Sequence, residues 1–87
     1  MTAAKNTNPG GMPGTLMQAH RELVCIRPDR DASLPTWLAY YERSASVYEH
    51  IAEVDPGHEG EAQYWAQRER VRARKIKAQI NGETPGE

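Results

Sequence analysis

The sequence contains no phenylalanine, a single cysteine and no long apolar run, and each of these features limits what the chain can be. The lone Cys25 has no second cysteine with which to form an internal disulfide, and an isolated thiol is typical of a reducing cytoplasm. No stretch approaches the roughly 20 apolar residues that a bilayer span requires. The first residues also lack the apolar core of a signal peptide. We therefore expect a soluble cytoplasmic protein that does not enter a membrane.

The length of 87 residues suits one small domain, and both ends of the chain are rich in proline and glycine. We predict flexible tails over residues 1–14 and 82–87, which leaves residues 15–81 for a helical domain. A domain of this size buries a small core and has little stability to spare. Association with a partner protein, or with a second copy, would add to that stability.

Hydrophobic periodicity predicts three helices and no strand. Thr15 and Gln18 have the spacing of a capping box at the start of the first helix. Ser33 is suited to cap a second helix over about residues 34–54. A break at the DPGHEG segment separates it from a third helix over about residues 59–81.

The predicted fold class is all-α. We expect a small three-helix domain with disordered termini, in which the second and third helices form a hairpin and the first helix is short. The brief connection between the last two helices favours their antiparallel packing. Gly82 is suited to the left-handed conformation that ends many helices.

The second helix is predicted to be the central element, because it carries two apolar lines and one neighbour cannot cover both. The first line consists of Leu34, Trp37, Leu38, Tyr41, Ala45, Tyr48 and Ala52, and the second of Tyr40, Val47, Ile51 and Val54.

The third helix has a carboxylate in the middle of its predicted buried stripe. Glu69 would be costly there unless it pairs with His20 or an arginine, or unless the interface is thin and wet. Tyr64, Val71 and Ala78 form a second, weaker line at heptad spacing and are a candidate association surface. The buried stripe itself consists of Ala62, Trp65, Ala66, Ala73, Ile76 and Ile80.

Charge is divided along the chain. Residues 33–67 contain six acidic side chains and one basic side chain, whereas residues 68–80 contain six basic side chains and one acidic side chain. The six basic residues are Arg68, Arg70, Arg72, Arg74, Lys75 and Lys77. On a helical wheel they flank the buried stripe, with Arg68, Arg72 and Lys75 on one side and Arg70, Arg74 and Lys77 on the other. Such a pattern fits a solvated helix face, a protein-binding surface or phosphate binding.

A catalytic or metal site is not predicted. Imidazole and carboxylate groups gather near the turn before the third helix, but their spacing matches no established ligand pattern. We interpret this segment as a polar loop with a helix-capping His or Glu. There is no phosphate-binding glycine loop and no arrangement that suggests an activated nucleophile, so we expect neither an enzyme nor a cofactor. The residues concerned are His50, Asp55, His58, Glu59 and Glu61.

The segment YEHIAEVDP, from Tyr48 to Pro56, resembles the end of the second helix of a tetratricopeptide unit. Trp37 is out of phase with the rest of that repeat, so a peptide-binding repeat groove is not implied. The longer run from Trp37 to Arg70, preceded by Arg27 and Pro28, resembles a family of short uncharacterised actinobacterial proteins. That resemblance implies a small helical accessory or regulatory protein and no particular activity. It rests on Trp37-Leu38, Arg43-Ser44-Ala45, Val47-Tyr48, Ala52 to Asp55, Gly57-His58, Glu61-Ala62 and Tyr64-Trp65-Ala66.

The sequence therefore predicts a non-catalytic helical protein that acts by binding another protein or a second copy of itself. The predicted protein-binding residues are Tyr40, Val47, Ile51, Arg70, Arg74 and Lys77. The alternative is a regulator that binds nucleic acid through the basic third helix, with Arg68, Arg70, Arg72, Arg74, Lys75 and Lys77 as its contacts. The slightly acidic net charge of −1 and the separation of aromatic residues from the basic run weigh against that alternative.

Overall fold

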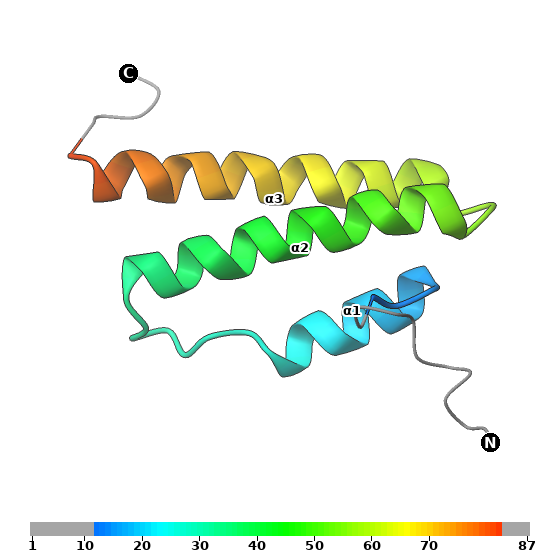
Figure 1. Ribbon diagram of the computed structural model, residues 1–87, viewed down its shortest axis with the longest axis horizontal. Helices are drawn as coiled ribbons and strands as arrows, with labels where there is room; N and C mark the ends of the chain where they lie inside the picture. The colour runs from blue at the N-terminus through cyan, green and yellow to red at the C-terminus, as the bar shows by residue number, and fades with distance from the viewer. Residues whose placement is uncertain (1–11, 83–87) are drawn as a thin grey trace.

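The computed structural model describes residues 12–82 and contains three α-helices within them (Figure 1). Helix α1 spans Leu16–Cys25, α2 spans Leu34–Val54 and α3 spans Glu59–Ile80. No strand occurs in this part of the chain. The predicted all-α, three-helix domain is confirmed, and most of the predicted tails lie outside the described residues.

Capping side chains begin two of the helices where the sequence predicts. The Thr15 hydroxyl accepts a hydrogen bond from the Gln18 amide at 3.1 Å, and the Ser33 hydroxyl accepts one from the Thr36 amide at 3.3 Å. The Gln18 side chain differs slightly from the predicted capping box, because it accepts from the amide of Gly14, at 2.9 Å, instead of that of Thr15. These bonds satisfy amides that have no partner inside the helix.

Glycines with positive φ follow α2 and α3. Gly57 has φ of 91° in the turn between these helices, and Gly82 has φ of 77° two residues after the end of α3. Residues with a Cβ rarely adopt this conformation, so glycine is suited to both positions. The predicted role of Gly82 is confirmed.

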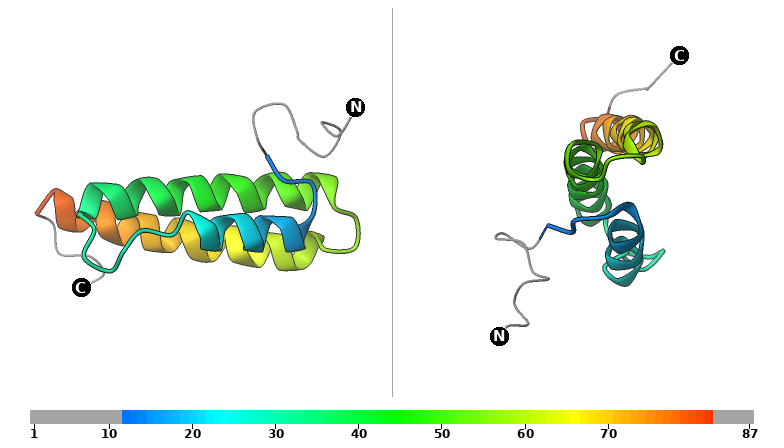
Figure 2. Two further views of the ribbon diagram at one scale, coloured as in Figure 1. Left: turned by 90° about the horizontal axis from the view of Figure 1, so that it is seen from below. Right: turned by 90° about the vertical axis from the view of Figure 1, so that its right-hand side faces the viewer.

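Helix α2 lies between the other two helices (Figure 2). It forms an antiparallel hairpin with α3, and α1 packs on another side of α2, also antiparallel to it. The start of α1 is therefore close to the turn that joins α2 and α3. This arrangement agrees with the prediction that the second helix has neighbours on two sides.

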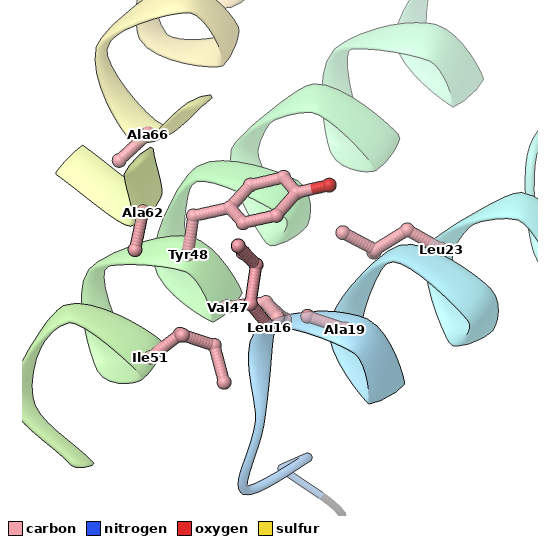
Figure 3. Close-up of a cluster of buried hydrophobic side chains, with 8 residues drawn as sticks. All are labelled: Leu16, Ala19, Leu23, Val47, Tyr48, Ile51, Ala62 and Ala66. Carbon is pink, nitrogen blue, oxygen red and sulfur yellow. The ribbon is translucent and has the colours of Figure 1, made fainter. Parts of the chain in front are cut away.

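The core lies where all three helices meet, near the α2–α3 turn (Figure 3). Val47 and Ile51 of α2 face α1 and are only 2% and 0% exposed. Two alanines on α3 allow α2 and α3 to pack closely. The buried cluster consists of Leu16, Ala19, Leu23, Val47, Tyr48, Ile51, Ala62 and Ala66.

The other end of the hairpin is less well covered. Ile80 is 41% exposed and Leu34 is 38% exposed, although the sequence places both on buried stripes. Helix α1 is only ten residues long and packs near the turn, so it does not reach these positions. The predicted stripe on α3 is therefore buried at Ala62, Ala66 and Ala73 but not at its C-terminal end.

Candidate functional site

Two residues of the predicted protein-binding surface are buried in the core. Val47 and Ile51 face α1, and their side chains contact the apolar residues of that helix (Figure 3). The prediction that they form an exposed surface is wrong. Helix α1 covers the apolar line that contains Val47 and Ile51. The sequence pattern did not indicate which helix would pack on that line.

Tyr40 lies apart from the basic residues of that predicted surface. The Tyr40 hydroxyl donates a hydrogen bond to the carbonyl of Leu23 at 3.1 Å, so Tyr40 faces α1. Arg70 instead binds Glu49, with Nε and Nη2 donating to the two carboxylate oxygens at 3.0 and 2.8 Å. Tyr40 and Glu49 are nine residues apart on α2, which places them on opposite sides of the helix. Tyr40 and Arg70 therefore belong to different surfaces.

Five of the six basic side chains of α3 are divided between two shallow hollows, and Lys77 lines neither of them. One hollow is lined by Arg70 and Arg74 together with Glu49 and Glu53 of α2. The other is lined by Arg68, Arg72 and Lys75 together with Tyr64 and Val71. The basic run therefore does not form a single ridge, in agreement with the helical-wheel prediction.

Three arginines each lie over an aromatic ring, and we call this set of six residues the arginine face. Two of the arginines come from α3 and one from the segment after α1, whereas two of the rings come from α2 and one from α3. A guanidinium over a ring gains from the charge distribution of the π-system. The distances from the guanidinium carbon to the ring centroid are 5.5 Å for Arg27 and Trp37, 5.0 Å for Arg68 and Trp65, and 5.8 Å for Arg72 and Tyr41.

Glu69 lies buried beside the arginine face and is only 7% exposed. Burial raises the pKa of its carboxyl, while the positive charges of Arg72, Arg68 and Arg27 oppose that increase. The closest cation is Arg68, whose Nη1 is 3.9 Å from a carboxylate oxygen of Glu69. An arginine therefore accompanies this carboxylate, as one of the sequence interpretations expected.

His20, the other predicted partner of Glu69, contacts Tyr48 instead. The Nδ1 atom of His20 is 2.7 Å from the Tyr48 hydroxyl oxygen, and the His20 ring meets the Trp65 ring edge-on at 5.3 Å. Burial raises the pKa of Tyr48 to about 12, so this hydroxyl stays protonated at neutral pH. The contact joins all three helices through one residue from each.

The corner between α2 and α3 holds the start of α1. An Asp55 carboxylate oxygen accepts a hydrogen bond from the Leu16 amide at 2.8 Å and lies 3.0 Å from Nδ1 of His58. The Leu16 amide chiefly, and His58 in addition, lower the pKa of Asp55. The expectation that a His or Glu of this segment caps a helix is wrong, because His58 at the start of α3 makes no capping hydrogen bond. The capping side chain is Asp55 instead, and the helix that it caps is α1.

The same corner does not form a metal site in the structure. Among residues 12–82, no three His, Cys, Asp or Glu side chains converge closely enough to hold a metal ion. The cap role of Asp55 had no local sequence signal, because Leu16 is 39 residues away. Arg27 was also missed as a site residue, since it lies in the connection after α1 and outside the periodic segments.

None of the helices in the described part of the chain is long and apolar enough to cross a bilayer. Comparison with protein-family models, with curated proteins and with solved structures finds no match to this chain. The arginine face and the surface beside it are therefore interpreted from their own chemistry.

Proposed function

We propose that this chain is a non-catalytic helical protein that works in the cytoplasm by binding another protein. The observation that carries the proposal is the arginine face with the exposed Tyr64 ring beside it, on a chain that also exposes large apolar side chains on α1. Met17 and Val24 on α1 are 68% and 71% exposed, and Tyr64 on α3 is 62% exposed. Contiguous exposed apolar surface on a small protein commonly marks a binding site.

Tyr64 borders the arginine face directly, and the exposed apolar residues of α1 are reached through His20. Met17, His20 and Val24 share one side of α1, because they are three and four residues apart. Of these three residues, His20 contacts the Trp65 ring of α3, over which Arg68 lies. Tyr64 contacts the same Trp65 ring at 5.4 Å. A partner that covers the arginine face would therefore also cover exposed apolar side chains.

Nucleic-acid binding is the second candidate, and one observation favours it. The exposed Tyr64 ring lies in the same hollow as Arg68, Arg72 and Lys75, and single-stranded nucleic acids bind surfaces that combine aromatic rings with cations. Arg70 on the same helix is already bound to the Glu49 carboxylate, and the chain as a whole has a net charge of −1, which disfavours phosphate binding. We therefore place protein binding first.

Site-specific photo-crosslinking in living cells tests the proposal. A photoreactive amino acid replaces Tyr64 in one variant and Ala39 in a matched variant, since Ala39 is also exposed but lies on another side of the molecule. We expect a discrete protein adduct from position 64 and little from position 39. Equal adduct yields from both positions, or none from position 64, would contradict protein binding at this face.

Two further measurements separate the named alternatives. Sedimentation of the purified chain over a concentration series shows whether the adduct partner is a second copy. A salt titration with duplex and single-stranded DNA tests the rival, because phosphate binding weakens steeply as salt rises. Tight DNA binding that depends on Arg68 and Arg72 would favour the nucleic-acid function instead.

A further inference from the structure

We infer that the arginine face binds an amphipathic helix of another protein, one that carries Asp or Glu beside a line of large apolar side chains. This inference rests on the proposed function and adds the chemistry of the partner. It comes from the number of cations gathered on this face, from the way in which they are held, and from the apolar residues beside them.

The arginine face has more positive than negative charge. Arg27, Arg68 and Arg72 are close enough to Glu69 for all three charges to act on its carboxyl, yet Glu69 is one carboxylate against three guanidinium groups. Its closest contact, with Arg68, measures 3.9 Å, which is too long for a hydrogen bond. A carboxylate from a partner would therefore meet guanidinium N–H groups that Glu69 does not bind.

The opposite surface of the hairpin shows the contrast. Arg70 uses both Nε and Nη2 to bind the two carboxylate oxygens of Glu49, so its paired donors and its charge are already matched within the chain. Arg68 and Arg72 lie two residues before and two residues after Arg70 on the same helix. They bind no carboxylate of the described residues in this way but lie over the Trp65 and Tyr41 rings. The guanidinium groups of the arginine face therefore have no bidentate carboxylate partner among residues 12–82, whereas that of Arg70 has one.

Aromatic contact also holds the arginines in place. A guanidinium that lies over a ring keeps its N–H groups at its edge, where they can form paired hydrogen bonds with a carboxylate. Arg72 is held further by a long hydrogen bond of 3.4 Å from Nη1 to the Tyr41 hydroxyl. Side chains that are ordered before binding lose less entropy when a partner arrives.

The apolar residues beside these cations suit a helix. Tyr64 and Val71 are seven residues apart and line one hollow with Arg68, Arg72 and Lys75. This is the spacing at which a partner helix lies along α3 and places its own apolar side chains between them. Acidic residues beside the apolar line of that partner would then meet the basic residues of α3.

A second copy of the chain is a poorer occupant than a different protein. Its acidic residues on the outer side of α2 are Glu42, Glu49 and Glu53, and the residues between them on that side are small, as Ser46 is. Such a surface brings no large apolar side chain to the hollow, and its Glu49 is already bound by Arg70. Docking between different surfaces of identical chains would also add further copies, as a ring or an open filament, and not form a simple dimer.

The test uses the full chain and two synthetic helical peptides that differ in charge alone. Each peptide is about three heptads long with leucine at the a and d positions. One carries Glu at its flanking positions and the other carries Lys there. The two tryptophans, Trp37 and Trp65, both belong to the arginine face, so their indole N–H signals report binding by NMR.

We expect the acidic peptide to shift both indole signals and to bind at least about tenfold more tightly than the basic peptide, with affinity that falls as salt rises. Arg72→Gln should weaken binding about tenfold, the loss typical of one charged contact. Arg72→Lys should lie between Arg72→Gln and the native chain, because it keeps the charge but loses the planar fork. Arg74→Gln, in the other hollow, should change affinity less than about twofold. Urea unfolding of each variant shows that the fold is retained.

Several results would overturn the inference. These are no binding of the acidic peptide, equal binding of both peptides, or equal weakening by Arg72→Gln and Arg74→Gln. Displacement of the acidic peptide by a lower concentration of duplex DNA would assign the face to nucleic acid. If the acidic peptide fails while crosslinking at position 64 still yields a protein adduct, protein binding stands and the partner chemistry is wrong. If both fail, the proposed function fails too.

Discussion

The two ends of the α2–α3 hairpin are covered in different ways. At the turn end, helix α1 packs over α2 and buries Ile51 and Val47 almost completely. At the open end, where α2 begins and α3 ends, no third helix is present among the described residues, and Leu34 and Ile80 stay more than a third exposed. The same two helices therefore have a closed core at one end and a partly exposed interface at the other.

The aromatic residues toward the open end are covered by arginine side chains instead of by a helix. Arg27 lies over Trp37 and Arg72 lies over Tyr41. Long basic side chains shield apolar surface with their stems and keep their charge in water. We therefore expect stability to be concentrated at the turn end, where the core is closed, and the arginine-covered rings are the surface to which we propose that a partner binds.

Shortening an apolar side chain at each end gives the largest expected difference. Ile51→Ala should lower the free energy of unfolding by about 2–5 kcal/mol, since it leaves a cavity in a closed core. Ile76→Ala, at a half-buried position toward the open end, should cost roughly 1 kcal/mol. Urea unfolding followed by circular dichroism measures both. Equal losses would show that the two ends are packed alike.

The Asp55 cap makes the turn end sensitive to acid. The folded state lowers the pKa of Asp55 because the carboxylate accepts from the Leu16 amide. Its stabilising contribution is therefore complete above the ordinary pKa of the group and is lost as the pH falls through the lowered value. The free energy of unfolding should fall more steeply below about pH 4 for the native chain than for Asp55→Asn.

Identical acid dependence in the two proteins would mean that the Asp55 charge does not hold α1. Thr15→Ala serves as a control, because it removes a cap of the same helix without removing a titrating group. It should lower stability at every pH without changing the slope.

Glu69 should have the opposite pH dependence. Burial raises its pKa, so the folded state disfavours the charged form. The resulting loss of stability is absent below the ordinary pKa and develops as the pH rises from that value to the raised one. Glu69→Gln should therefore raise the free energy of unfolding at pH 7, on the order of 1 kcal/mol, and have little effect near pH 3. A less stable variant at pH 7 would show that the surrounding arginines depend on this charge.

The sequence predicted the elements of the fold well. The second helix was predicted over its observed range, because Ser33 and the DPGHEG segment give strong local signals at its two ends. The caps at Thr15 and Gly82 are likewise encoded within a few residues of where they act. Local chemistry of this kind can be read directly from the order of residues.

The predicted binding surface failed at Val47 and Ile51 because periodicity shows that a line is apolar but not which neighbour covers it. Contacts between residues that are far apart along the chain also left no recognisable pattern in the sequence. The bond from Leu16 to Asp55 joins segments 39 residues apart, and Arg27 reaches Trp37 from an irregular connection. These features depend on the tertiary arrangement and become visible only when the helices are placed.

The smallest expected effect concerns the ion pair between Arg70 and Glu49, which lies away from the arginine face. Arg70 and Glu49 form two hydrogen bonds, but their side chains are 39% and 50% exposed. Arg70→Gln should lower the free energy of unfolding by about 0.2–1 kcal/mol. The difference from the native chain should shrink at high salt, because salt screens exposed charges. A larger loss that salt does not change would place this pair among the determinants of the fold.

Native-state amide hydrogen exchange along α2 tests the central claim most directly. This one helix runs from the open end to the turn end. Some of its amides therefore lie under the closed core and others under the arginine side chains, within a single element. We predict that amides around Val47 and Ile51 exchange only through global unfolding, while those around Tyr40 and Tyr41 exchange through local opening at lower free energy. Uniform protection along the helix would contradict the division of the molecule into a stable turn end and a more open end.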